Sequence, residues 1–471
     1  MATASARAGD RADARSALET AERLLEPGAS PARTTGPTRE ATLVLRELSN
    51  GLGTLRGRDR RRAEAILARP TERADRFGDY FGNEAASSPV CDADFCVHWS
   101  RSERHAPAPA DADQNGTPDY VDDVLAAAAT SRAVENGTLG WRPAKPDGET
   151  GARRGKGGSG QVDVYVRDLG RNIFGYAASD PRVTGRSRSG YLVIDNDYAR
   201  FTGEPLDLMR VTIAHEYNHI LQFAYDSFQD EWLFESTATW VEDHVFGEIN
   251  DYVNFLDAFA RRPHKPLAEP NRRPVRLYGS AMWNHWLAAR HGTDVVRSTW
   301  EGSRRTNPIS FAVAAYDRAI AGAGGSSFSR EFAAFAAASA EWNALRSFPD
   351  AGSYPDMRRS GRLQGARKLR LDHTTYRLFK VKGGGRKVLA IQAARGTRSG
   401  VALVGRRGGS AEGSVTIRSK YLPRGGRAVV SLPDAGKYSR VTALVINADG
   451  RSEDGRRYSR DNRRFKVRLR G

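Results

Sequence analysis

The stretch Val211–Asp226, "VTIAHEYNHILQFAYD", limits most strongly what this chain of 471 residues can fold into. It is rich in apolar residues, and neither glycine nor proline interrupts it, so the pattern predicts a helix. His215 and His219 then lie one turn apart on one helix face. Two imidazoles so placed can both reach one zinc ion, with Glu216 close enough to act as a base on water. The alternative is a structural helix, because HExxH also arises by chance.

A zinc site needs a third protein ligand, and Glu231–Phe246, "EWLFESTATWVEDHVF", offers two glutamates. A third histidine is excluded, because Gln222 and Tyr225 stand where that pattern needs glycine and histidine. Glu235 follows the second histidine by 16 residues, which leaves room for a turn and an antiparallel return. We expect Glu235 to be the third ligand. Glu242, on the same helix face, is the alternative ligand or the partner that holds a ligand histidine.

The two segments together resemble the gluzincin class of zinc metalloproteases. They are most similar to secreted bacterial metalloproteases with the signature HEYxHxxQ…W(L/F)xExxAxWxE, and the similarity runs from about Cys91 to Trp300 through "DADQNGTPDYVDD" and "YGSAMWNHW…GTDVV". The spacing to the glutamate is shorter than in better-studied gluzincins, and Thr239 stands where some relatives hold an acid that orients a histidine. The resemblance implies three zinc ligands and one catalytic residue: His215, His219, Glu235 and Glu216.

Zinc chemistry on this scaffold predicts peptide hydrolysis, in which Glu216 takes the proton of the attacking water and passes it to the leaving amine. The developing oxyanion needs a donor. We prefer Tyr278, in "RLYGSAMW", over His285 and His244, although a packed aromatic is the alternative reading of Tyr278. Residues Gly190–Tyr198, "GYLVIDNDY", read as a strand and are our candidate for the sheet edge that binds substrate backbone.

A second metal site is predicted in "DADQNGTPDYVD", which fits a twelve-residue calcium loop with a turn at Gly116. Pro118 and the final aspartate depart from the paired helix–loop–helix form and favour a stand-alone loop. An acidic polar turn is the alternative. The predicted calcium ligands are Asp111, Asp113, Asn115, Thr117 through its carbonyl, Asp119 and Asp122.

The positive charge of the chain is concentrated at one end. The whole sequence has a formal net charge of +17, yet Ser353–Gly471 holds 30 Lys+Arg against 8 Asp+Glu, a net of +22, and the remainder is −5. Such a region attracts anionic polymers, nucleic acid or membrane surfaces, unless it reflects solubility and an arginine-rich coding bias. No zinc-finger or RNA-binding signature is present and aromatics are not interleaved, so we expect no sequence-specific nucleic-acid partner.

The two cysteines, Cys91 and Cys96, close a short loop and predict a local disulfide, with two free thiols as the alternative. A disulfide and a calcium loop favour an extracellular, secreted protein, although no signal peptide is visible in the first residues. No run of 18 apolar residues exists, so we expect no transmembrane segment. We expect a monomer.

We expect three segments: a helical N-terminal region at 1–80, which is a pro-segment or a brace; a zincin-like metallopeptidase domain at 85–350; and a basic domain at 355–471. The fold class is then α+β, a small sheet with the HExxH helix and a helical subdomain, followed by an all-β sandwich of seven short strands. The Gly- and Arg-rich stretch 148–161 is expected to be a mobile loop.

Two functions follow from these features. The first is a zinc-dependent endopeptidase with Glu216 as general base. The second is a non-catalytic zincin-like binding protein whose basic β-sandwich attaches to anionic cell-surface polymers.

Overall fold

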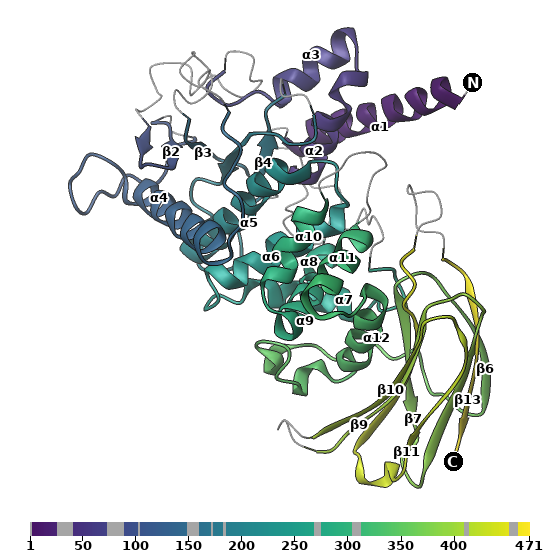
Figure 1. The fold of residues 1–471 in the computed structure, drawn as a ribbon. Coiled ribbons are helices and arrows are strands. Elements are labelled where there is room, and N and C mark those ends of the chain that lie inside the picture. The colour runs from purple at the N-terminus through teal and green to yellow at the C-terminus, as the bar shows by residue number, and fades with distance from the viewer. Residues whose placement is uncertain are drawn as a thin grey trace. The chain divides into compact units, whose positions relative to one another are not determined.

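The computed structural model divides by its contacts into two compact units, Met1–Phe228 with Val241–Ile249, and Gln229–Trp240 with Asn250–Gly471. Helix α6 (Glu231–Val245) contributes to both. The chain is a mixture of helices and sheets with an all-β region at its C-terminal end, as expected (Figure 1). The residues described are 2–25, 41–72, 89–101, 104–147, 160–170, 173–181, 185–267, 275–303, 312–408, 414–451 and 460–471.

The first unit holds a five-stranded sheet in the order β1-β2-β3-β5-β4. Strands β2, β3 and β5 are parallel, whereas β1 and β4 are antiparallel to their neighbours. The prediction that the "GYLVIDNDY" strand lies at an edge is wrong, because β5 pairs on both sides and β4, which was not predicted, is the edge. The strands are β1 (Val90–Cys91), β2 (Phe95–His98), β3 (Val162–Val166), β4 (Gly175–Ser179) and β5 (Gly190–Ile194).

Helix α5 (Pro205–Asp226) packs closely against β4 and β5. A Cβ at Gly175 would lie 2.7 Å from Thr212 Cγ2, and one at Gly190 would lie 3.1 Å from Ile220 Cδ1. Glycine at these two strand positions therefore lets the helix backbone approach the sheet. Helix α4 (Asp119–Arg132), which continues as a π-helical segment η3 (Ala133–Thr138), lies beside α5.

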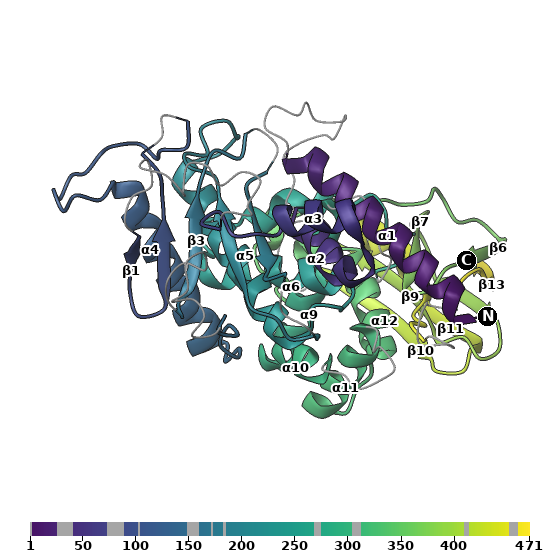
Figure 2. The same ribbon diagram turned by 90° about the horizontal axis from the view of Figure 1, so that it is seen from above.

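Three N-terminal helices belong to the same unit, as the apolar spacing of this region predicts. They share a hydrophobic cluster with strand residues such as Tyr165, Tyr176 and Tyr191. Figures 1 and 2 show the three helices side by side. Their bounds are α1 (Ala2–Leu25), α2 (Ala41–Gly51) and α3 (Gly57–Ile66), with a 3-10 turn, η1, at Leu52–Thr54.

Arg69, just after α3, ties this region to the sheet from within the core. Arg69 is 1% exposed, and its guanidinium donates to a carboxylate oxygen of Asp163. It also donates to both carboxylate oxygens of Asp180, at 2.9 and 3.1 Å. A buried ion-pair network of this kind is costly to break from one side. The described N-terminal helices and Arg69 are thus part of the core of this unit.

The disulfide between Cys91 and Cys96 joins β1 to β2 at paired positions, as predicted. Among the described residues, no helix is long and apolar enough to cross a membrane. The stretch 148–159 of the predicted mobile loop lies outside the described residues.

The second unit begins with the first part of α6 and continues through short helices built on aromatic packing. Trp283, for example, has ring neighbours at Tyr316, Phe328 and Phe335. The helices are η5 (Asp251–Phe255), α7 (Leu256–Ala260), α8 (Val275–Gly279), α9 (Ala281–His291), α10 (Asp294–Ser303), α11 (Ala312–Gly324), α12 (Phe328–Ser339), η6 (Trp342–Ala344) and η7 (Ala351–Ser353).

The all-β region forms two antiparallel four-stranded sheets, β10-β9-β12-β7 and β11-β8-β13-β6, around one hydrophobic core. Seven strands match those expected, and β6 is an eighth whose basic residues obscured its alternation. The strands are β6 (Ala366–Leu371), β7 (Thr375–Val381), β8 (Lys387–Ala393), β9 (Ser399–Arg406), β10 (Val415–Leu422), β11 (Gly426–Leu432), β12 (Arg440–Asn447) and β13 (Arg463–Arg470), with η8 (Ala435–Lys437) after β11.

Candidate metal centre

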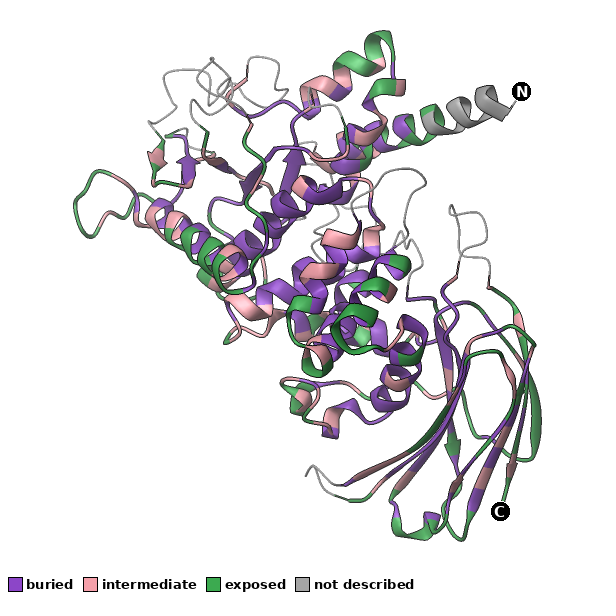
Figure 3. Ribbon diagram, viewed as in Figure 1, coloured by how far each residue is buried: buried purple, intermediate pink, exposed green. Residues whose placement is uncertain are grey.

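Helices α5 and α6 follow one another and supply the predicted zinc ligands. Pro205 and Asp207 in the first turn of α5 favour the start of the helix. The N–H groups of a first turn have no partner within the helix, so proline loses no hydrogen bond there. The carboxylate of Asp207 interacts favourably with the positive end of the helix dipole. Both histidines, Glu216, Glu235 and Glu242 are at most 2% exposed, and α5 is buried along most of its length (Figure 3). Burial of so many polar groups demands partners for each.

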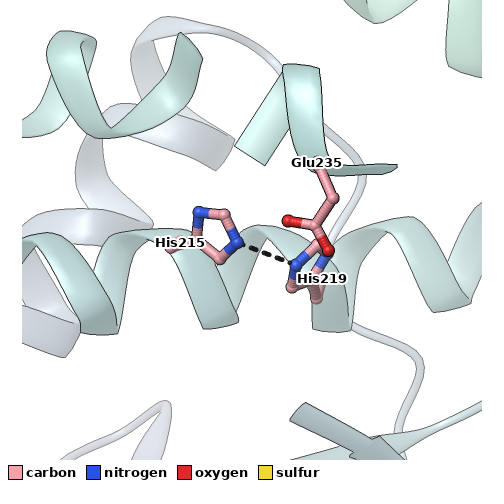
Figure 4. A group of neighbouring side chains, drawn as sticks. All are labelled: His215, His219 and Glu235. Carbon is pink, nitrogen blue, oxygen red and sulfur yellow. Dashed lines mark hydrogen bonds between the residues drawn. The ribbon is translucent and has the colours of Figure 1, made fainter. Parts of the chain in front are cut away.

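The structure brings His215, His219 and Glu235 together. One ligand atom from each lies within 4.8 Å of the other two. Figure 4 shows both imidazoles rising from α5 and the Glu235 carboxylate reaching down from α6 towards them. The two Nε2 atoms are 3.0 Å apart.

Glu242 fixes the proton of the first imidazole. Its Oε1 lies 2.5 Å from His215 Nδ1, on the ring side away from His219. Because a carboxylate accepts, Nδ1 carries the proton and Nε2 of a neutral ring presents a lone pair. Glu242 therefore orients the His215 ring.

A chain of amides fixes the proton of the second imidazole. His219 Nδ1 lies 2.7 Å from Gln222 Oε1, and Gln222 Nε2 donates to Asn218 Oδ1 at 2.6 Å. Asn218 Nδ2 in turn donates to Glu135 Oε2 at 2.9 Å, where η3 delivers this buried carboxyl group. Each acceptor in the chain forces the next group to donate, so His219 Nδ1 is protonated and Nε2 is again a lone pair.

Two lone pairs facing each other at 3.0 Å repel unless a cation lies near both. Two imidazole nitrogens and a carboxylate suit zinc, which takes three protein ligands and leaves one position for reaction. The donor set of His215, His219 and Glu235 would therefore suit a zinc ion. Burial raises the pKa of Glu135 well above its usual range, and its Oε2 accepts from the Asn218 amide.

Glu216 lies beside the two histidines on α5 and is fully buried. Its Oε2 accepts a hydrogen bond of 2.8 Å from the Thr42 hydroxyl of α2. No hydrogen-bond partner is found for Oε1 among the described residues. One oxygen of the predicted base is therefore held by the N-terminal region, and the other is left for chemistry.

The predicted oxyanion donors lie on α8, α9 and α6. Tyr278 is buried on α8 with its ring centroid 5.0 Å from that of Phe255, and the His285 ring lies tilted by 35° against the Tyr252 ring, with 4.9 Å between the centroids. His244 lies in the last turn of α6. The assignment of Tyr278 as oxyanion donor stays a prediction.

The acidic loop before α4 closes on itself as its spacing predicts. Asp111, Asp113 and Asp119 each place a carboxylate oxygen within 4.8 Å of the other two. Asp111 accepts from the backbone N–H of Asn115 and of Gly116, which has a φ of +88° that favours glycine. Of the three remaining predicted ligands, Asn115 donates from its amide to Asp122 at 3.1 Å and accepts from the backbone N–H of Thr117 at 2.7 Å.

Residues 202–382 match the model of a family of unknown function, DUF6055. This range begins just before α5 and runs through α6 to the end of β7, so it contains all three candidate zinc ligands. No curated protein matches the chain.

Sequence reasoning missed three residues that shape this site: Thr42, Asn218 and Glu135. Asn218 stands inside the motif "HEYNH", so its position between the histidines was the available signal. Glu135 lies 83 residues before its partner Asn218, and Thr42 lies 174 residues before its partner Glu216. No sequence pattern around Glu135 or Thr42 indicates that they contact α5.

We predict that Gln222→Leu lowers the affinity for Zn²⁺ about 10- to 100-fold, because His219 Nδ1 loses the acceptor that fixes its tautomer. Competition with a chromogenic chelator measures the affinity. Gln229→Leu is the matched control, since Gln229 is also a buried glutamine but bonds the Ser303 carbonyl instead. Equal affinities for the two variants would contradict the assigned hydrogen-bond chain.

Proposed function

We propose that the protein is a zinc-dependent endopeptidase of the gluzincin type. The observation that carries this proposal is the pair of Nε2 lone pairs, each fixed by its own buried hydrogen-bond chain and both directed to the side where Glu235 lies. A structural helix has no need of this arrangement. Glu216 adds a buried carboxylate next to the same place, which a metal site used only for stability does not require.

A bound zinc ion would supply Lewis acidity, lowering the pKa of water and polarising a carbonyl group. The chain's own residues then do the proton transfer. Glu216 Oε1 accepts the proton of the attacking water and afterwards donates it to the amine that leaves. Glu242 holds His215, and Gln222 holds His219, in the orientation that keeps both Nε2 atoms available throughout.

The edge strand β4 is the place where we expect peptide backbone to bind. Strand addition needs outward-facing N–H and C=O groups at a sheet edge. Ala177, in the middle of β4, directs its N–H away from the sheet to the Thr42 hydroxyl, 2.9 Å away. That N–H and Glu216 share one bonding partner, so a peptide on β4 would lie beside the catalytic carboxylate.

Glu216→Gln should keep about one zinc per chain and lose peptide cleavage by at least about 10²-fold, because the amide cannot take a proton. Metal analysis and hydrolysis of a peptide library measure the two properties. Glu204→Gln, an exposed change just before α5, is the control and should leave both unchanged. The proposal would be wrong if the wild type bound no zinc, or if Glu216→Gln still cleaved peptides at the wild-type rate.

The acidic loop supports a second part of the proposal, that the protein binds calcium and acts outside the cell. Hard carboxylate oxygens at alternate positions suit Ca²⁺, and extracellular calcium fills even weak sites. The disulfide Cys91–Cys96 is compatible with the same compartment.

Millimolar Ca²⁺ should raise the melting temperature by a few degrees, because the ion binds only the folded loop. In Asp111→Asn with Asp113→Asn the rise should disappear. A control that removes two exposed acids elsewhere, Asp257→Asn with Asp294→Asn, should keep it. Differential scanning calorimetry decides, and an equal response to Mg²⁺ would argue against a calcium loop.

A second candidate function is attachment to an anionic surface through the basic β-sandwich. The observation that favours it is the charge of Ser353–Gly471, 30 Lys+Arg against 8 Asp+Glu. It does not compete with catalysis, since it uses other residues.

A further inference from the structure

The outward face of the sheet β11-β8-β13-β6 carries only positive charge. Phe465 and Val467 of β13 point into the sandwich core, so the residues that alternate with them point outwards. The four strands contain no aspartate or glutamate at all. We call the seven exposed basic residues of these strands that face outwards the cationic face: Lys368, Arg370, Arg427, Arg464, Lys466, Arg468 and Arg470.

The strand register places like charges directly opposite one another. Arg464 pairs with Arg370, and Lys466 pairs with Lys368, across β13 and β6. Like charges at facing positions destabilise a sheet. Basic residues often protect edge strands from aggregation, and Lys368 and Arg370 lie on the edge strand β6, but β13 lies between β8 and β6 and is not an edge. On β13 the facing cations therefore cost stability without protecting an edge.

Nothing nearby neutralises this charge. Among the described residues, none of the seven side chains of the cationic face forms an ion pair with a carboxylate. The outward positions between them on β8 and β11 are small or uncharged, namely Val388, Ala390, Gln392, Val429 and Ser431. The cationic face therefore carries seven cations that have no carboxylate partner among the described residues.

We propose that the cationic face binds a linear phosphodiester polymer without bases, of the kind displayed on cell surfaces. Alternate residues of one strand are about 6.6–6.8 Å apart, so the four cations of β13 form a row of about 20 Å that suits a chain with regularly spaced charges. Five of the seven are arginines, whose planar guanidinium binds phosphate oxygens in pairs. The face has no aromatic side chain on which bases could stack.

The test uses the full chain and a poly(glycerol phosphate) of defined length. Lys466→Gln with Arg468→Gln removes two cations from the face. Arg418→Gln with Lys420→Gln removes two exposed cations from β10, in the other sheet, and is matched in net charge. Binding is measured by calorimetry over a range of salt concentrations, with duplex DNA, oligothymidylate and phosphatidylglycerol vesicles as comparison ligands.

We expect the face variant to bind at least tenfold more weakly and to lower the slope of log K against log salt by roughly 1.4–1.8, at about 0.7–0.9 per charge. The β10 variant should bind like the wild type. Equal losses in both variants would show that net charge alone matters, and would overturn the proposal. Tighter binding to DNA or to vesicles than to the polymer would overturn it in favour of that surface.

A second inference concerns α2 and rests on the proposed function. The Thr42 hydroxyl donates to Glu216 Oε2 at 2.8 Å and accepts from the Ala177 N–H at 2.9 Å. The same helix is fixed at its other end, where the Ser49 and Ser179 hydroxyls are 2.8 Å apart and Asn50 Nδ2 donates to the Ser227 carbonyl at 2.8 Å.

We infer that α2 holds the chain in a latent form by occupying the place of a peptide on β4. A single hydroxyl group uses both the carboxylate that would accept the water proton and an edge N–H that would bind substrate backbone. Glu216 is fully buried while α2 is in place, and the Thr42 hydroxyl occupies one of its oxygens. Release of α2 exposes both groups at once.

Thr42→Asp tests this inference, because a second carboxylate facing Glu216 repels it and displaces α2. Thr42→Val removes both hydrogen bonds but keeps the volume, which covers the case in which the aspartate variant folds poorly. Glu47→Ala, an exposed change on α2, is the control. The readouts are the rate at which a chelator removes zinc and the rate of peptide cleavage.

We expect both Thr42 variants to lose zinc at least tenfold faster than the wild type and to cleave faster, with Glu47→Ala unchanged. Wild-type rates equal to those of the Thr42 variants would overturn latency while leaving a peptidase. Faster zinc loss with no cleavage in any variant would keep the occlusion and overturn the peptidase proposal. A chain that binds no zinc would overturn both.

Discussion

The arrangement around α5 depends on where each imidazole carries its proton. A buried histidine cannot borrow hydrogen bonds from water, so its partners decide its tautomer. Here Glu242 sets one ring and the amides of Gln222 and Asn218 set the other. The second chain ends at Glu135, at the point where α4 passes into a π-helical segment, a local feature that is often retained for a functional reason. These few hydrogen bonds therefore connect the π-helical segment to the imidazoles of α5.

Close packing of α5 on the sheet makes this precision possible. Gly175 and Gly190 remove two side chains that would hold the helix away, so the helix that carries the histidines and the edge strand β4 are fixed against each other. The groups that would bind substrate are then preorganised, and α2, which covers them, is attached both through its apolar residues and through polar bonds that water or a peptide could replace.

The helices of the site could be predicted because their signals are local. "VTIAHEYNHILQF" carries its ligands at helical spacing, and Glu235 follows within one turn and return. β4 could not be predicted, because "GYAAS" is short and made of small residues without β-branched side chains, and its pairing with β5 provides its order. Thr42 lies 174 residues from Glu216, and only the folded chain brings them together. β6 escaped notice because its apolar positions stand among arginines and lysines.

The facing cations of β6 and β13 reverse the usual effect of ionic strength. Salt weakens most surface electrostatics that stabilise a protein, but on this face it screens repulsion between Arg464 and Arg370 and between Lys466 and Lys368. We therefore expect the sandwich to be more stable against unfolding at high salt than in dilute buffer. A bound polyanion would screen the same repulsion locally. The free energy that the facing cations cost the sheet is therefore recovered at high salt or when a polyanion is bound.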